Sequence, residues 1–167
     1  HGLDSMAIRQ VFAQSSNVGT ATLTQKYFKA NPSAFVEHLR DFGLDLPTDI
    51  EVGGEETPIV KDPKDPKSGW SGTTLPWMSI GYELLMTPMQ LLTFYNAVAN
   101  DGRMMKPYVV QRTERYGDVI KEFQPTVVKR SIASKTTIKR AQELLREVVL
   151  TGTAKNIRPA NYSIAGK

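Results

Sequence analysis

Two short polar clusters contain the residues of this sequence whose types could do chemistry. The first is Ser15-Ser16-Asn17, in which a hydroxyl and an amide are separated by one residue. The second is Gly166-Lys167. A hydroxyl, an amide and an amine can move protons and orient a substrate in acyl transfer. Serine and asparagine are also common turn residues, and the lysine could instead face solvent. Each cluster alone is therefore weak evidence.

Most other chemistries lack the residues they require. The sequence has no Cys, which excludes a thiol nucleophile, a disulfide scaffold and a cysteine zinc site. Its two histidines are His1 and His38, and His38 is a poor metal ligand together with Glu37, because adjacent residues of a helix do not face each other. No glycine pattern matches a dinucleotide or phosphate loop. We expect no metal and no cofactor.

Length and composition are those of one globular domain or a large piece of one. The chain has 167 residues, of which 40% are hydrophobic and 23% are charged. The formal net charge is +4, but the basic stretch 61–67 also contains aspartates, so we expect no nucleic-acid partner. No apolar run is long enough to span a membrane, and no signal peptide opens the chain. Because the sequence lacks an initiator Met, we interpret it as a segment of a longer protein.

Apolar residues at helical spacing on both sides of the Ser15-Ser16-Asn17 cluster predict two helices that are joined by a turn at the cluster. Ser5 is the predicted N-cap of the first helix. Asn31-Pro32 predicts the start of a third helix, with the asparagine as cap and the proline in the first turn, and Gly43 predicts its end.

The middle of the chain is predicted to be a long irregular connection over residues 44–76, which is rich in proline and glycine. Thr87-Pro88-Met89-Gln90 has the pattern of a capping box, which predicts a helix that ends at Asn100-Asp101-Gly102. Ser134 is the predicted cap of a longer helix that ends at Thr151-Gly152-Thr153.

Two strand regions are predicted. Residues 107–123 predict a hairpin, with one strand at 108–110, a turn at Gly117-Asp118 and a second strand at 119–123. Residues 162–167 predict a final strand that carries Gly166 and Lys167. Trp70 and Trp77 flank an irregular segment, and we interpret them as packing anchors rather than as a substrate platform.

The order of these pieces resembles the transpeptidase domain of class B penicillin-binding proteins, and the resemblance covers nearly the whole chain. Residues 12–19 are similar to the family's second motif, a variant of Ser-Asp-Asn. Residues 75–82 and 87–91 resemble its approach to a central helix, and residues 96–102 resemble the end of that helix. Residues 162–167 resemble the lead into its Lys-Thr-Gly motif.

The resemblance implies an α/β (α+β) transpeptidase fold of the serine β-lactamase type. This chain would supply mostly the helical lobe, plus one strand that carries a motif. The implied activity is that of a serine-type D,D-transpeptidase, which cross-links peptidoglycan stem peptides through an acyl-serine and binds β-lactam antibiotics. The implied partners include a membrane-bound cell-wall synthesis or division assembly. The implied location is the outer face of the cytoplasmic membrane, with an anchor outside this segment.

The same resemblance implies roles for four residues. Ser15 would relay protons to the leaving nitrogen, and Asn17 would bind and orient the donor amide. Lys167 would provide positive potential for the substrate carboxylate and for Ser15. Gly166 would allow the substrate to approach the backbone closely.

Three departures from the family pattern limit what this chain does alone. No Ser-x-x-Lys occurs, so the nucleophilic serine and its lysine are absent. Of Lys-Thr-Gly only the lysine is present, and Glu83 stands where many relatives have glycine. We therefore expect residues 1–167 to be a partial transpeptidase domain that is inactive by itself. Two alternatives stay open: a β-lactam-sensing or non-catalytic binding domain of the same fold, and a helical interaction module unrelated to cell walls.

Overall fold

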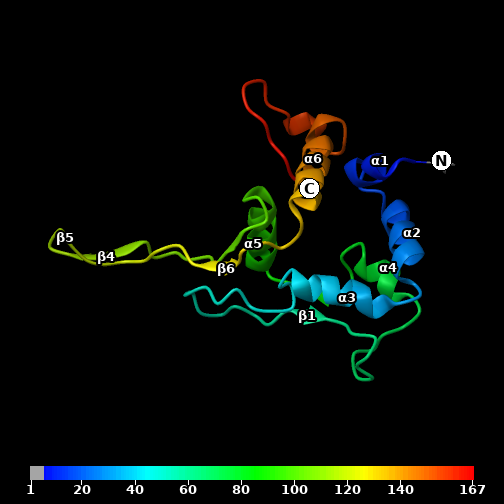
Figure 1. Cartoon of the computed structure of the whole chain (residues 1–167), viewed down its shortest axis with the longest axis horizontal. Helices are drawn as coiled ribbons and strands as arrows, with labels where there is room; N and C mark the ends of the chain where they lie inside the picture. Colours follow the sequence, from blue (N-terminus) through cyan, green and yellow to red (C-terminus); the bar gives the residue numbers. More distant parts are fainter. Residues whose placement is uncertain (1–5) are drawn as a thin grey trace.

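The computed structural model describes residues 6–167 and combines helices with short antiparallel strand pairs (Figure 1). The helices are α1 (Ile8–Ala13), α2 (Asn17–Phe28), α3 (Pro32–Asp41), α4 (Thr74–Met78), α5 (Pro88–Ala99) and α6 (Lys135–Leu150), with a 3-10 turn at Lys155–Ile157. The strands are β1 (Ile59–Val60), β2 (Leu84–Leu85), β3 (Met104–Met105), β4 (Arg112–Arg115), β5 (Asp118–Glu122) and β6 (Val127–Lys129). They pair as β1–β2, β3–β6 and β4–β5.

The predicted helix boundaries are largely confirmed. Ser16 is the N-cap of α2 and accepts a hydrogen bond from the backbone N–H of Gly19 at 3.2 Å. Asn31 occupies the N-cap position of α3, although its side chain makes no capping bond. Gly43 follows α3 with a φ of +72°, a conformation that glycine adopts without strain. The predicted cap Ser5 lies outside the described residues.

The capping box at the start of α5 also forms and does more than begin the helix. Thr87 Oγ1 accepts from the Gln90 backbone N–H at 3.2 Å, and Gln90 Oε1 accepts from the Thr87 backbone N–H at 2.7 Å. The buried Gln90 side chain also donates to the Leu46 carbonyl at 3.0 Å. This bond attaches the irregular connection to α5.

The irregular connection itself is mostly as predicted, with two ordered elements that the sequence pattern missed. Its Ile59–Val60 strand pairs with Leu84–Leu85. Near its end, Thr74–Met78 forms the short helix α4, which begins where the Ser71 backbone N–H donates to Thr74 Oγ1 at 3.0 Å.

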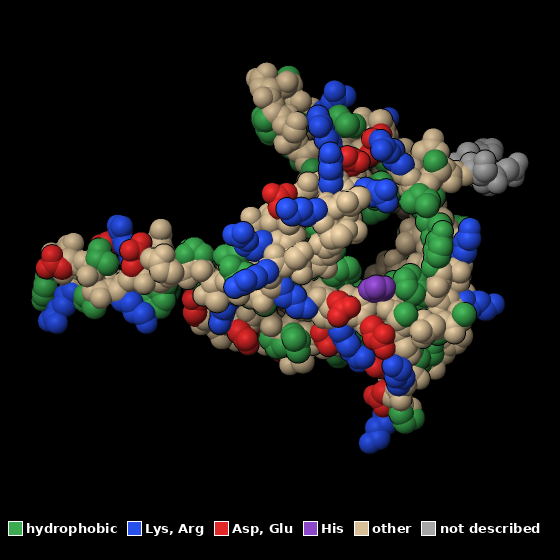
Figure 2. Space-filling model, viewed as in Figure 1, with side chains coloured by type: hydrophobic (Ala, Val, Ile, Leu, Met, Phe, Trp, Pro, Cys, Tyr) green, Lys and Arg blue, Asp and Glu red, His purple; other side chains and the backbone are tan. Residues whose placement is uncertain are grey.

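The hairpin exists, but the prediction of its first strand at 108–110 is wrong. The strand lies at Arg112–Arg115 instead, where it pairs with Asp118–Glu122, and the turn is at Tyr116-Gly117 rather than at Gly117-Asp118. Both turn residues have positive φ, +53° and +93°, as two-residue hairpin turns with the twist of the flanking strands require. The hairpin projects from the body, and Figure 2 shows basic, acidic and apolar side chains mixed along it.

The prediction of a final strand at 162–167 is also wrong. This segment is irregular, and no segment among residues 6–167 forms a ladder with it. An extended segment without a hydrogen-bonded neighbour does not form a sheet. Instead, the Gly166 backbone N–H donates to the Leu145 carbonyl of α6 at 3.2 Å.

The core lies where the helices meet. α6 packs against α1 and α5, and α2 packs against α1, α3 and α4. The buried apolar residues come from most of these elements: Val11, Ala13, Val36, Leu44, Leu75, Met78, Ala97, Val98, Met104, Ile138, Val148 and Val149. Lys and Arg side chains gather over α6 on its outer side (Figure 2). In residues 6–167, no helix combines the length and the apolar character needed to cross a membrane.

We predict that Gly152→Ala destabilises the chain. A Cβ at this position would lie 2.2 Å from the Ala13 carbonyl oxygen and 2.8 Å from that of Val148. Because both are backbone atoms, α1 and α6 would have to move apart. Overpacking of this kind costs about 1–3 kcal/mol, which thermal unfolding followed by circular dichroism would detect as a lower Tm.

Gly72→Ala is the matched control. Nothing lies within 4 Å of a Cβ at Gly72, so this variant should unfold at the temperature of the original chain or slightly above it. Equal melting temperatures for the two variants would contradict the close contact between α1 and α6.

Candidate active site

The structure brings the two polar clusters together. The Lys167 amine donates a hydrogen bond to Ser15 Oγ, although the two residues are 152 positions apart in the chain. Figure 1 shows the C-terminal segment returning to α6, which packs against α1. A serine hydroxyl bound to an amine is an arrangement that can pass protons.

Ser15 lies in a strained turn between α1 and α2. Its φ is +52°, in the left-handed region that residues other than glycine rarely adopt. The turn is closed by backbone hydrogen bonds from Ser15 to Phe12 at 3.2 Å and from Ser16 to Val11 at 3.0 Å. Strain of this kind costs about 1–3 kcal/mol and tends to occur at functional sites.

The end of α6 holds this turn in place. The Thr153 backbone N–H donates to the Ala13 carbonyl at 3.1 Å, and Gln14 Nε2 donates to the Thr151 carbonyl at 3.2 Å. The predicted helix end at Thr151-Gly152-Thr153 therefore also supports Ser15.

Burial against the turn lowers the pKa of the Lys167 amine from its ordinary value. The amine also lies 5.1 Å from the centre of the Phe12 ring, within the range of a cation–π contact. Desolvation favours the neutral form of a lysine. Lys167 is thereby brought closer to the range in which an amine both gives and takes protons.

Asn17 is the first residue of α2 and is exposed. Within residues 6–167 its side chain makes no hydrogen bond, so the amide is free to bind a ligand. It lines a small apolar cavity of about 220 Å³ together with residues of α2 and of the α4 region. The amide to which the family resemblance gives a substrate-orienting role therefore borders an apolar space.

Gly166 uses its backbone N–H for the bond to Leu145, so that group is occupied within the chain. No atom lies within 4 Å of a Cβ built at this position. Its proposed role in close approach therefore depends on a ligand and stays a prediction.

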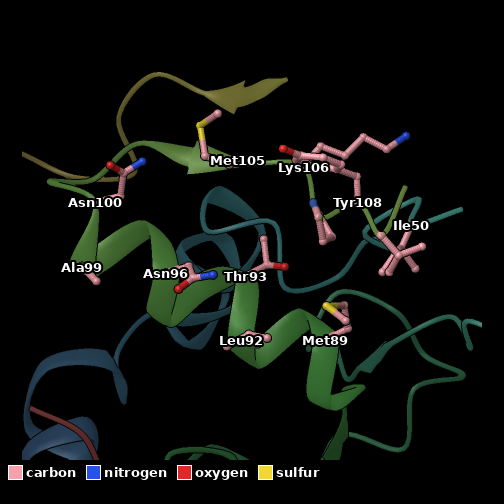
Figure 3. Close-up of a pocket in the computed structure, with 12 residues that line it drawn as sticks. Ile50, Met89, Leu92, Thr93, Asn96, Ala99, Asn100, Met105, Lys106 and Tyr108 are labelled. Atoms are coloured by element: carbon pink, nitrogen blue, oxygen red, sulfur yellow. The ribbon is translucent and has the colours of Figure 1, made fainter. Parts of the chain in front are cut away.

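A larger cavity lies elsewhere. It has a volume of about 600 Å³ and lies between α5 and the segment 105–109. Figure 3 shows Leu92, Thr93 and Asn96 of α5 below Met105 and Lys106. None of the predicted site residues lines it. No cluster of His, Cys, Asp or Glu suited to a metal ion occurs in the described part of the chain.

Glu83 stands where many relatives have glycine, and its side chain has two polar partners in this structure. It has a φ of +56°, where glycine would be unstrained. Its carboxylate accepts from Thr74 Oγ1 at 2.6 Å and from the Lys61 amine at 3.0 Å. The bond from Thr74, followed by that from Lys61, lowers the pKa of Glu83. Sequence reasoning singled out Glu83 but had no signal for these two distant partners.

Comparison with known proteins assigns the chain to a family. The model of the penicillin binding protein transpeptidase domain matches residues 1–167, so the chain belongs to that family. It is 33% identical to the penicillin-binding protein PbpB of Mycolicibacterium smegmatis over 175 aligned residues, which cover 100% of this chain and 26% of PbpB. It is 25% identical to the peptidoglycan D,D-transpeptidase FtsI of Escherichia coli over 92% of this chain and 26% of FtsI.

Solved structures agree with this assignment. Penicillin-binding protein 3 of Mycobacterium tuberculosis, in complex with ampicillin, is similar with a TM-score of 0.72 and 33% identity. The alignment covers 89% of this chain and 31% of that protein. The predicted α/β transpeptidase fold and the class B resemblance are thus confirmed. The chain spans about a quarter of the length of the curated relatives PbpB and FtsI.

We predict that Lys167 titrates below a lysine of the unfolded chain. After the lysines are methylated, the NMR signal of Lys167 is assigned as the one that is missing in Lys167→Arg. The midpoint of its pH titration should lie at lower pH in the folded chain than in urea. Because the folded state then releases this proton first, the unfolded state binds more protons between the two pKa values. The free energy of unfolding should therefore rise with pH across that interval.

Lys167→Met should lose this part of the pH dependence. A Lys167 signal with the same midpoint in the folded chain and in urea would show that the amine is fully solvated and does not lie against Ser15 and Phe12.

Proposed function

We propose that this chain is the proton-relay and substrate-orienting part of a serine-type peptidoglycan D,D-transpeptidase. The observation that carries the proposal is the hydrogen bond from Lys167 to Ser15 at the turn that leads into Asn17. It joins two motifs that the family pattern places far apart in sequence. The family match and the relatives named as D,D-transpeptidases support the same reading.

The reaction is an acyl transfer. A serine outside this sequence gives its proton to the lysine of the family's Ser-x-x-Lys motif and attacks the carbonyl of the donor D-Ala–D-Ala amide. The C–N bond of the tetrahedral intermediate then breaks, and the terminal D-Ala is the leaving group. The leaving nitrogen needs a proton. The Ser15 hydroxyl gives it one and takes in exchange the proton held by the lysine of the Ser-x-x-Lys motif. An amine of a second stem peptide then attacks the acyl-serine and loses a proton along the reverse path.

Lys167 and Asn17 have different tasks in this scheme. The positive charge of Lys167 attracts the carboxylate of the donor peptide and stabilises the Ser15 oxygen when it has given up its proton. The amide of Asn17 binds the amide of the donor and aligns it for attack. Gly166 borders the path of the donor beside Lys167.

The proposed substrates are peptidoglycan stem peptides, and β-lactams would act as mimics of the donor. Ampicillin bound to the Mycobacterium tuberculosis relative supports the second point. We further propose a location at the outer face of the cytoplasmic membrane, within a cell-wall synthesis or division assembly. The names of the relatives support a cell-wall role for this chain.

We predict that the 167-residue chain forms no covalent adduct with benzylpenicillin. The sequence contains no Ser-x-x-Lys, so no serine is activated in the way the family requires. Intact mass spectrometry after incubation would show the mass of the unmodified chain. A stoichiometric adduct would mean that a serine of this chain is the nucleophile and that the proposed roles are wrong.

In the complete protein that contains this chain, Asn17→Ala should slow acylation by β-lactams. Loss of one well-placed donor at a reacting centre typically costs about 10²–10³ in rate. Because Asn17 is exposed, its loss should leave the melting temperature nearly the same. Stopped-flow measurement of acylation checks the first point and thermal unfolding checks the second.

Asn156→Ala is the matched control, since Asn156 is also exposed and lies outside the proposed site. It should acylate at the original rate. Equal rates for the Asn17 variant and the original protein would refute the orienting role. Acylation without cross-linking of stem peptides would instead favour a β-lactam-sensing domain.

A further inference from the structure

Positive charge is concentrated in the last part of the chain. Residues 123–167 contain nine Lys and Arg but only two Glu and no Asp, which gives this part a net charge of +7. The 122 residues before them contain 12 Lys and Arg against 15 Asp and Glu, a net charge of −3. Such an asymmetry within one chain indicates that the positive part meets an anionic partner.

Four of these cations lie together on the outer side of α6. Lys135, Lys139, Arg140 and Arg146 are all exposed, and we call them the α6 basic face. Figure 2 shows Lys and Arg side chains gathered over this helix. Because an α-helix rises 1.5 Å per residue, the face extends for about 16 Å along α6. It is therefore long enough to contact several charges of one partner.

The charges of α6 are arranged against the stability of the helix. Lys135 is its first residue, no acidic residue lies in the first turn, and no basic residue lies in the last turn. The partial charges at the ends of a helix favour the reverse arrangement. Lys135 and Lys139 are also four positions apart, where like charges repel each other. Local arrangements that oppose stability are expected mainly where they serve a function.

Nearby carboxylates do not neutralise the α6 basic face. Within residues 6–167, none of its four cations takes part in an ion pair. Glu143 is the one acidic residue on the exposed side of α6. Asp101 borders a hollow of about 480 Å³ together with Lys135 and Lys139, but it forms no ion pair with either of them. The face therefore keeps a net positive charge toward solvent.

The α6 basic face offers charge and little else to a partner. No large apolar side chain of α6 is exposed, and the helix contains no aromatic residue. Stable interfaces with folded proteins usually have an apolar core, helices that insert into membrane surfaces carry apolar side chains, and single-stranded nucleic acids stack their bases on aromatic rings. The face is therefore suited to a flexible chain of anions, which charge alone can recognise.

We propose that the α6 basic face binds a flexible polyanion that carries phosphate groups along its chain. Arg140 and Arg146 can each bind a phosphate through two parallel N–H···O bonds, and Lys135 and Lys139 attract phosphates as point charges. The positive end of the α6 dipole adds to the attraction beside Lys135. The inference goes beyond the acyl-transfer chemistry, because the face contains no residue of the candidate active site.

Fluorescence anisotropy of fluorescein-labelled inorganic polyphosphate, titrated with the complete protein that contains this chain, tests the inference. A flexible single-stranded polyanion loses about 0.7 in the slope of log K against log salt concentration for each contact, so four contacts should give a slope of about −3. A triple variant with Lys135→Gln, Lys139→Gln and Arg140→Gln should bind roughly tenfold more weakly or worse near physiological salt. Its slope should be less steep by about 2.

Glutamine has a helix propensity close to that of lysine and arginine, so the triple variant should keep the melting temperature of the original protein. If this variant does not fold, Arg146→Gln serves in its place as a single change on the same face. It should weaken binding several-fold and make the slope less steep by about 0.7.

The matched control is a second triple variant with Lys26→Gln, Lys67→Gln and Lys121→Gln. It removes the same charge from exposed residues outside α6. Binding of polyphosphate should remain nearly as tight as in the original protein, with the same dependence on salt. Equal weakening in the two triple variants would show that only the total charge matters and would overturn the inference.

Vesicles of phosphatidylglycerol and phosphatidylcholine separate a polymer from a membrane surface. If the original protein does not bind polyphosphate, the inference is wrong. If it binds these vesicles instead and the α6 triple variant does not, the partner of the face is a lipid surface. Salt-dependent binding of polyphosphate that the α6 triple variant loses and the control variant keeps supports the inference.

Discussion

The backbone contact between the end of α1 and the end of α6 is the constraint on which the candidate site depends. The Thr153 N–H binds the Ala13 carbonyl, and the missing side chain of Gly152 allows the two helix ends to come this close. Without the contact, the turn that carries Ser15 would have no fixed position relative to Lys167. The packing of two helices thus sets the geometry of the proposed proton relay.

The strain at Ser15 follows from the same constraint. A left-handed serine persists only when its surroundings fix it, and here the backbone bonds of the turn and the end of α6 do so. Glu83 is in a similar conformation and is held by Thr74 and Lys61. In both places a residue with a polar side chain adopts a backbone conformation that suits glycine.

Local signals in the sequence predicted the helix ends well, because caps are short-range chemistry. The Thr87 to Gln90 capping box and the Ser134 cap involve atoms three residues apart. The hairpin was predicted with its turn one residue off, because the positive φ of Tyr116 is unusual for an aromatic residue. The strand at 162–167 failed since pairing depends on a neighbour that no local pattern specifies. Residue types singled out the two polar clusters, but their roles came only from the family resemblance, and the cavity beside Asn17 had no sequence signal.

The projecting β4–β5 hairpin has a practical consequence. Its strands pair with each other through a two-residue turn, and all of their residues are exposed. Exposed loop tips tolerate changes in length and sequence, so we expect the tip at Tyr116 to accept them without disturbance of the helices that position Ser15. The tip at Tyr116 is therefore a suitable place to attach a fluorophore or an affinity tag, at a distance from the chemistry it would be used to observe.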